Sequence, residues 1–141
     1  MAVTRADALT GTTKQKEYFS DFLTGFDMTP FGNQLGRVTN DQAVNQSLRN
    51  LIKTSLGERL FQPTIGSDIY AMIFENNYPE VITELELFIK NTIDNNEPRV
   101  NLEGVEIKDQ SNENALEISI YYTLINNPEP ITLTVLLKRV R

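Results

Sequence analysis

The first regular pattern of apolar and polar positions begins at Asn40. Apolar side chains then recur every three or four residues, the spacing of one face of an α-helix. Thr39 to Asp41 suit the start of this helix, and Gly57 is expected to end it. The stripe comprises Val44, Leu48, Leu51, Ile52 and Ser55. This pattern predicts an amphipathic helix packed on a core.

Two further helices are predicted downstream. Ser67 or Asp68 caps a short helix whose apolar residues are Ile69, Met72 and Ile73. Pro79 opens a third helix, which runs to about Thr92. Its buried stripe comprises Val81, Ile82, Leu85, Phe88 and Ile89.

After Arg99 the apolar positions alternate, which is the period of a β-strand. Strands are predicted over Val100 to Ile107, Ala115 to Ile125 and Ile131 to about Val140, with turns at residues 108–114 and 126–130. One face of the second strand carries Leu116, Ile118, Ile120, Tyr122 and Leu124, and the buried face of the third carries Ile131, Leu133, Val135 and Leu137. The predicted fold is α+β: three helices packed on a small antiparallel three-stranded meander.

Residues 1–38 do not have the pattern of a core segment. They are rich in Thr, Gly, Asn and Asp, and four of the seven phenylalanines lie there. We therefore predict an extended N-terminal arm over residues 1–38 and a single α+β domain over residues 39–141. The arm either wraps on its own domain or docks its aromatic side chains on a partner, and both alternatives stay open.

Composition narrows the possible chemistry. The chain has 141 residues, enough for one domain, and contains no cysteine and no histidine. Catalytic triads and zinc sites of thiolates and imidazoles are therefore excluded. The formal charge of −6 repels a phosphate backbone, and no stretch approaches the roughly 18 apolar residues of a membrane span. We expect a soluble protein made in the cytoplasm, with no nucleic-acid or membrane partner, no cofactor and no metal.

The tripeptide Glu97-Pro98-Arg99 lies where the helical pattern changes to the alternating one. Pro98 fixes its own φ and favours an extended conformation at Glu97. Arg99 has a forked set of donors for a carboxylate or carbonyl. The motif is therefore either a helix stop with an internal ion pair or a contact site for a partner.

Two other features have functional interpretations. The third strand lies at the end of the meander, so its edge is open to another chain, unless Lys138, Arg139 and Arg141 blunt it. Glu58, Asp68, Glu75 and Glu97 are the candidates for paired carboxylates that hydrolyse glycosidic bonds. The chain has no tryptophan to line a sugar cleft, so hydrolysis is the less favoured interpretation.

A longer motif combines these pieces in order. Its first part is Gly57-x-Arg59-x-Phe61-x-Pro63-x-x-Gly66-x-Asp68, and Phe74-Glu75, a helix, Glu97-Pro98-Arg99 and three strands follow. Over about residues 40 to 141 the chain resembles the baseplate wedge protein, or sheath initiator, of contractile-tailed phages. That family extends to the matching baseplate subunit of type VI secretion systems, and some members are labelled lysozyme-like.

The resemblance implies a structural protein of the virion tail baseplate, not an enzyme, that joins neighbouring wedge proteins and nucleates the tail sheath. It implies that Glu97, Pro98, Arg99 and Arg59 contact wedge proteins. It also implies that the C-terminal strands, with Val135, Leu137 and Arg139, pair with the sheath by strand addition. No small-molecule substrate is implied. The alternative is a peptidoglycan hydrolase with Glu58 and Glu97 as its acids.

Overall fold

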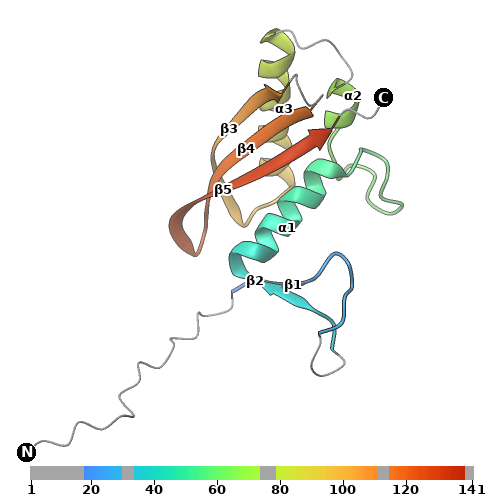
Figure 1. Ribbon diagram of the computed structural model, residues 1–141, viewed down its shortest axis with the longest axis vertical. Coiled ribbons are helices and arrows are strands. Elements are labelled where there is room, and N and C mark those ends of the chain that lie inside the picture. The colour runs from blue at the N-terminus through green and yellow to red at the C-terminus, as the bar shows by residue number, and fades with distance from the viewer. Residues whose placement is uncertain (1–17, 30–33, 74–78, 111–114, 139–141) are drawn as a thin grey trace, which may run out of the picture.

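The computed structural model describes residues 18–29, 34–73, 79–110 and 115–138. Its main sheet has three antiparallel strands in the order β3-β4-β5 (Figure 1). These strands are β3 (Val100–Gln110), β4 (Ala115–Leu124) and β5 (Asn127–Lys138). The predicted meander is therefore present, with β4 in the centre and β5 at one edge.

The alternating pattern correctly predicted the buried face of this sheet. One face of β4 buries Leu116, Ile118, Ile120, Tyr122 and Leu124, and β5 buries Leu133, Val135 and Leu137. Ile131, which was also predicted to be buried, is only partly buried. Ile118 lies opposite both Ile107 and Val135, so one row of apolar side chains crosses all three strands. Such cross-strand neighbours stabilise a sheet through side-chain contact.

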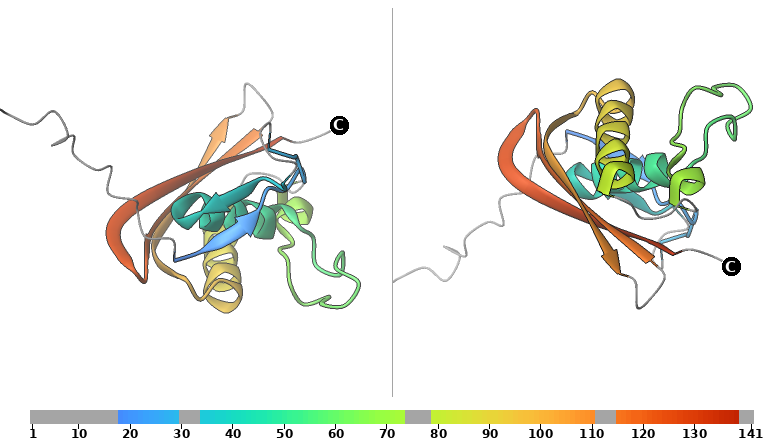
Figure 2. Two further views of the ribbon diagram at one scale, coloured as in Figure 1. Left: turned by 90° about the horizontal axis from the view of Figure 1, so that it is seen from below. Right: turned by 90° about the horizontal axis from the view of Figure 1, so that it is seen from above.

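Two long helices cover this apolar face. They are α1 (Asn40–Lys53) and α3 (Pro79–Asn96), and Figure 2 shows both on the same side of the sheet. Val44, Leu48 and Ile52 of α1 and Leu85, Ile89 and Ile93 of α3 join the buried cluster. No helix in the described residues is long and apolar enough to cross a membrane.

The prediction of three helices on a single three-stranded meander, with an extended arm before it, is wrong. A second antiparallel sheet joins β1 (Ser20–Phe22) to β2 (Arg37–Thr39), inside the segment expected to be extended. The helix α2 (Ile69–Ile73) has only five residues, so two long helices form the layer. Strands of three residues are too short to show an alternating pattern, which is why they were missed. The α+β class itself agrees with the structure.

Several boundaries also differ from the prediction. The first helix ends at Lys53 instead of Gly57, because Thr54 is extended. The third helix continues to Asn96, past Thr92. The last strand begins at Asn127, since Pro128 and Pro130 are tolerated in an edge strand. The division between residues 38 and 39 stays a prediction.

Candidate functional site

The end of α3 carries a forked ion pair within the Glu97-Pro98-Arg99 motif. Nε of Arg99 lies 2.6 Å from Oε1 of Glu97, and Nη2 lies 2.7 Å from Oε2. The backbone N–H of Glu97 still donates to Ile93, as in the last turn of a helix, and Pro98 is exposed beside it. The motif therefore ends the helix and forms an internal ion pair.

The Glu97 carboxylate is also bonded to α1. The hydroxyl of Ser47 donates to Oε2 of Glu97 over 2.6 Å, and Glu97 is only 4% exposed. Burial raises the pKa of Glu97, but hydrogen bonds from Arg99 and Ser47 and the Arg99 charge together lower it below its ordinary value. The buried carboxylate is thus ionised at neutral pH and connects two elements.

Arg99 lies between the ion pair and an aromatic ring. Its side chain is 30% exposed, and its guanidinium carbon lies 5.6 Å from the ring centre of Phe19. The hydrogen bond to Glu97 raises the pKa of Arg99. Nη1 forms no hydrogen bond to another residue in the described part of the chain. The guanidinium therefore keeps donors for another molecule.

A cavity of about 400 Å³ brings Arg59 to the same region as Glu97. It lies between the sheet of β1 and β2, α1, the loop after α1 and the end of α3. Its lining is mostly polar: Asp21, Ser47, Asn50, Leu51, Thr54, Arg59, Ile65, Asn96 and Glu97. Two of the predicted contact residues, which are 38 positions apart in sequence, thus border one cavity.

The predicted residues of the last strand have a different position. Val135 and Leu137 are buried and face the core, so their side chains are not available to a partner. The strand itself pairs with β4 and with no other described strand, and its second main-chain edge is therefore unpaired by the sheet. Arg139 lies outside the described residues.

The candidate acids differ in burial within the described part: Glu97 is buried, whereas Glu58 and Asp68 are exposed. Glu58 is exposed, and its carboxylate accepts a hydrogen bond from the backbone N–H of Ser55 over 3.0 Å. Asp68 is exposed on the chain segment before α2. Glu75 lies outside the described residues. No three acidic side chains are grouped as a metal site requires, within the same described ranges.

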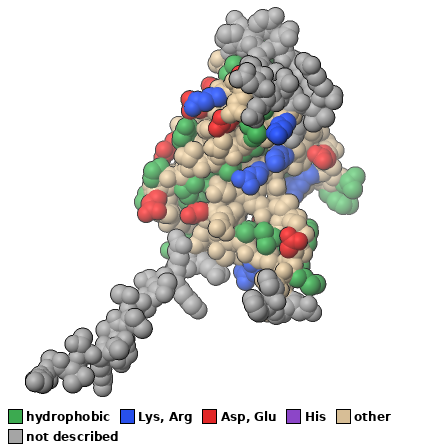
Figure 3. All heavy atoms as spheres, in the orientation of Figure 1, with side chains coloured by type: hydrophobic (Ala, Val, Ile, Leu, Met, Phe, Trp, Pro, Cys, Tyr) green, Lys and Arg blue, Asp and Glu red, His purple; other side chains and the backbone are tan. Residues whose placement is uncertain are grey.

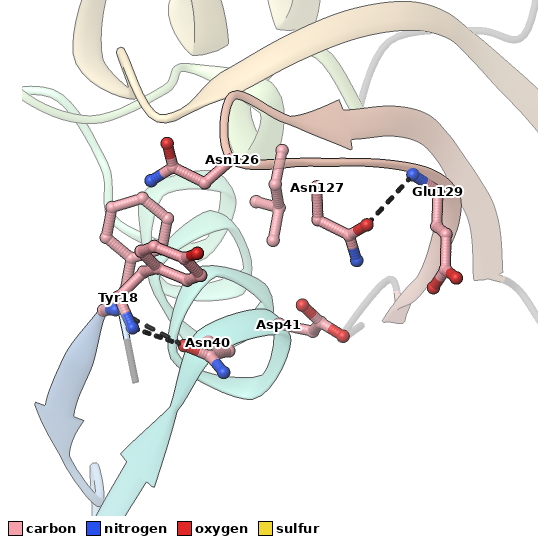
Figure 4. Close-up of a pocket in the computed structure, with 8 residues that line it drawn as sticks. Tyr18, Asn40, Asp41, Asn126, Asn127 and Glu129 are labelled. Atoms are coloured by element: carbon pink, nitrogen blue, oxygen red, sulfur yellow. Dashed lines mark hydrogen bonds between the residues drawn. The ribbon is translucent and has the colours of Figure 1, made fainter. Parts of the chain in front are cut away.

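A second cavity of about 320 Å³ was not predicted (Figure 4). Tyr18 and Phe19 form one wall, because Oδ1 of Asn40 accepts hydrogen bonds from both of their backbone N–H groups. Asn40 has a φ of 49°, a left-handed conformation that Asn tolerates better than most residues. The other lining residues are Asp41, Leu124, Asn126, Asn127 and Glu129. An Asn at a helix start was the only sequence signal.

The family model described as "Baseplate wedge protein gp25" matches residues 38–129. The chain belongs to this family. The resemblance found in the sequence is therefore confirmed, and the matched residues include both Arg59 and Glu97-Pro98-Arg99. Among curated proteins, the baseplate wedge protein gp25 of Enterobacteria phage T4 is 30% identical over 90 residues, which are 64% of this chain and 68% of the phage protein.

Three solved structures have folds similar to that of this chain. A protein described as a "putative tail lysozyme" from Geobacter sulfurreducens has a TM-score of 0.67 at 22% identity, over 72% of this chain and 92% of that one. A chain of the anti-feeding prophage baseplate has a TM-score of 0.60 at 23% identity, over 84% of this chain and 83% of that one. A chain of the type VI secretion baseplate complex has a TM-score of 0.54 at 14% identity, over 70% of this chain and 93% of that one.

Proposed function

We propose that this gp25-family chain is a non-catalytic structural component of a contractile-tail baseplate wedge, located in the tail of the virion and assembled in the host cytoplasm. The observation that carries the proposal is the family match across the domain that contains Glu97-Pro98-Arg99. The baseplate structures with the same fold support it. Its partners would be proteins, since the net charge of −6 disfavours nucleic acid.

The wedge contact is proposed at the exposed side of the motif. Glu97 is buried and fully engaged, so it orients Arg99, while Pro98 and the outer guanidinium nitrogen meet the partner. Arg59 is exposed at the same cavity and would add a second cation. A guanidinium held in one orientation by a carboxylate loses less conformational entropy on binding.

The sheath contact is proposed at the outer edge of β5. Strand addition requires an open main-chain edge, and the described sheet leaves that edge of β5 unpaired. Val135 and Leu137 support this interface by fixing the strand on the core. Arg139 would extend the same contact beyond the described strand. Main-chain pairing spreads a mechanical load over many hydrogen bonds.

Co-purification from the producing cells tests the adaptor function. The tagged wild-type chain should recover both wedge and sheath subunits, identified by mass spectrometry. Arg99→Lys retains the charge but loses the fork, so it should fold and lose wedge partners at least tenfold, because Arg and Lys are not interchangeable in forked pairs. Lys90→Arg, at an exposed position on α3, is the control. Recovery of no tail component by the wild type would refute the proposal.

A peptidoglycan hydrolase is the second candidate, and the likeness to the Geobacter protein is the observation in its favour. The site argues against it. A general acid needs a raised pKa, whereas the pKa of Glu97 is lowered and its carboxylate is engaged by Arg99 and Ser47. Clearing of peptidoglycan by the purified chain, abolished by Glu97→Gln in a folded protein, would establish the enzyme instead.

A further inference from the structure

The loop between α1 and α2 carries two large apolar side chains into solvent. Leu60 is 91% exposed and Phe61 is 96% exposed, more than any other large apolar residue in the described ranges. Figure 1 shows this loop projecting from the body of the protein, and Figure 3 shows hydrophobic side chains standing out at the same side. Adjacent exposed apolar side chains of this size are typical of interaction surfaces.

Hydrogen bonds fix the base of this loop. The backbone N–H of Ser67 donates to the carbonyl of Thr54 over 2.8 Å and joins the two ends of the loop. The buried hydroxyl of Ser67 donates to the carbonyl of Ile52 over 2.7 Å. Higher in the loop, the N–H of Gly57 donates to the carbonyl of Pro63 over 2.9 Å. Hydrogen bonds therefore hold the loop both at its base and between Gly57 and Pro63.

Two glycines give the loop a specific backbone path. Gly57 has a φ of 82° and Gly66 a φ of 144°, values that other residues rarely adopt. A Cβ atom at Gly66 would lie 2.8 Å from the carbonyl oxygens of Thr54 and Ser55, too close for any side chain. Because the backbone of the loop is held in one conformation, Leu60 and Phe61 are exposed in a fixed position before a partner binds. This lowers the conformational entropy that is lost on binding.

The surroundings of the pair indicate what it binds. Arg59 is exposed next to Leu60 and forms no ion pair with another described residue. The net charge of −6 disfavours an anionic lipid surface. In the described part of the chain, the cavities of about 320 and 400 Å³ are lined mostly by polar side chains, so they do not suit Leu60 and Phe61 of a second copy. These features favour a different protein.

We propose that Leu60 and Phe61 insert together into an apolar recess on a neighbouring baseplate protein, whose rim carries a carboxylate for Arg59. The inference rests on the proposed baseplate function and adds a third contact, separate from those at Arg99 and at β5. Arg59 connects this contact with the one at Arg99, because it belongs to the loop and also borders the cavity of Glu97. Buried aromatic anchors with a cation at the rim are a common arrangement in protein interfaces.

The test replaces the native copy in producing cells with Leu60→Gln, Phe61→Gln or the double variant. Contractile particles are isolated by sedimentation, and the chain is quantified in them by mass spectrometry. We expect at least a tenfold loss of the double variant from particles. Leu87→Gln makes the same chemical change at a 59% exposed position on α3 and should be retained at the wild-type level. The variants at Leu60 and Phe61 should keep the wild-type melting temperature, because these two side chains lie almost entirely in solvent.

The possible outcomes distinguish the loop contact from the baseplate function. Wild-type chain in the particles together with wild-type recovery of the double variant would overturn the inference and leave the baseplate function standing. Absence of the wild-type chain from particles would overturn the baseplate function and the inference with it. Self-association of the purified wild-type chain that Phe61→Gln abolishes, measured by sedimentation velocity, would assign the loop to a second copy and also overturn the inference.

Discussion

The hydroxyl of Ser47 in the middle of α1 donates a hydrogen bond to the carboxylate of Glu97 just after α3, across 50 positions of sequence. Arg99 donates to both oxygens of the same carboxylate. One buried anion therefore fixes the relative position of α1, the end of α3 and the start of β3. The motif that was expected to meet a partner is first a structural junction.

Ser47→Ala should destabilise the protein by about 1–3 kcal/mol, because the buried carboxylate loses one of its hydrogen-bond donors. The free energy of unfolding in urea measures this loss. Ser55→Ala is the matched control, since no side-chain hydrogen bond of Ser55 connects it to another described residue. An equal effect of the two substitutions would show that the Ser47–Glu97 bond contributes nothing specific.

Stability should fall in acid because of Glu97. The pKa of Glu97 in the folded state is lowered below the ordinary value of 4.5, so the unfolded chain binds the proton more readily. The contribution of the Glu97 carboxylate to the free energy of unfolding is complete above pH 4.5. It is lost as the pH falls through the lower pKa of the folded state. Glu97→Gln should be less stable at neutral pH, and its difference from the wild type should shrink on acidification. Urea unfolding between about pH 3 and pH 7 measures it.

Glu103→Gln is the control for this pH dependence. Glu103 is exposed on β3, so its substitution should leave both the stability and its pH profile close to the wild type. A difference between Glu97→Gln and wild type that stays constant across the acid range would contradict the lowered pKa.

Tyr122 should ionise later than an ordinary tyrosine. Burial, with the nearby charges of Asp41 and Glu97, raises its pKa to about 12, and its hydroxyl donates to Asn45 over 2.8 Å. Because the folded pKa is raised, this contribution to stability is complete below the ordinary value of 10.0 and is lost as the pH rises through about 12. Ultraviolet titration of the folded protein should show a late-ionising component that is absent in Tyr122→Phe. Titration of every tyrosine near the ordinary value would refute it.

A charge on the open edge should separate sheath binding from wedge binding. Thr134 is exposed on β5, where its neighbours Leu133 and Val135 face the core. Thr134→Lys should therefore leave the fold intact and block strand addition, since lysine on an edge discourages pairing. We expect co-purified sheath protein to fall at least tenfold, with wedge proteins retained. Glu103→Lys on β3 is the control, and equal loss of both partners would indicate misfolding instead.

The sequence by itself determined the helices and strands in which buried apolar residues recur at regular intervals. The stripe of α1 and the alternating faces of β4 and β5 follow from periods of 3.6 and 2, because each element must turn one face away from water. The ordered motif from Gly57 to Arg99 was also sufficient to identify the family.

Only the tertiary structure decided which distant residues meet. The sheet of β1 and β2 rests on two three-residue strands that have no readable period, and it places Phe19 against Arg99. Ser47 and Glu97, and Arg59 with Glu97 at one cavity, are brought together by the packing of separate elements. The sequence could not predict the exposure of Phe61 either, since a loop has no periodic pattern that shows whether an apolar residue faces the core or water. Periodicity encodes which face of an element is buried, whereas the partner across that face depends on how all the elements pack.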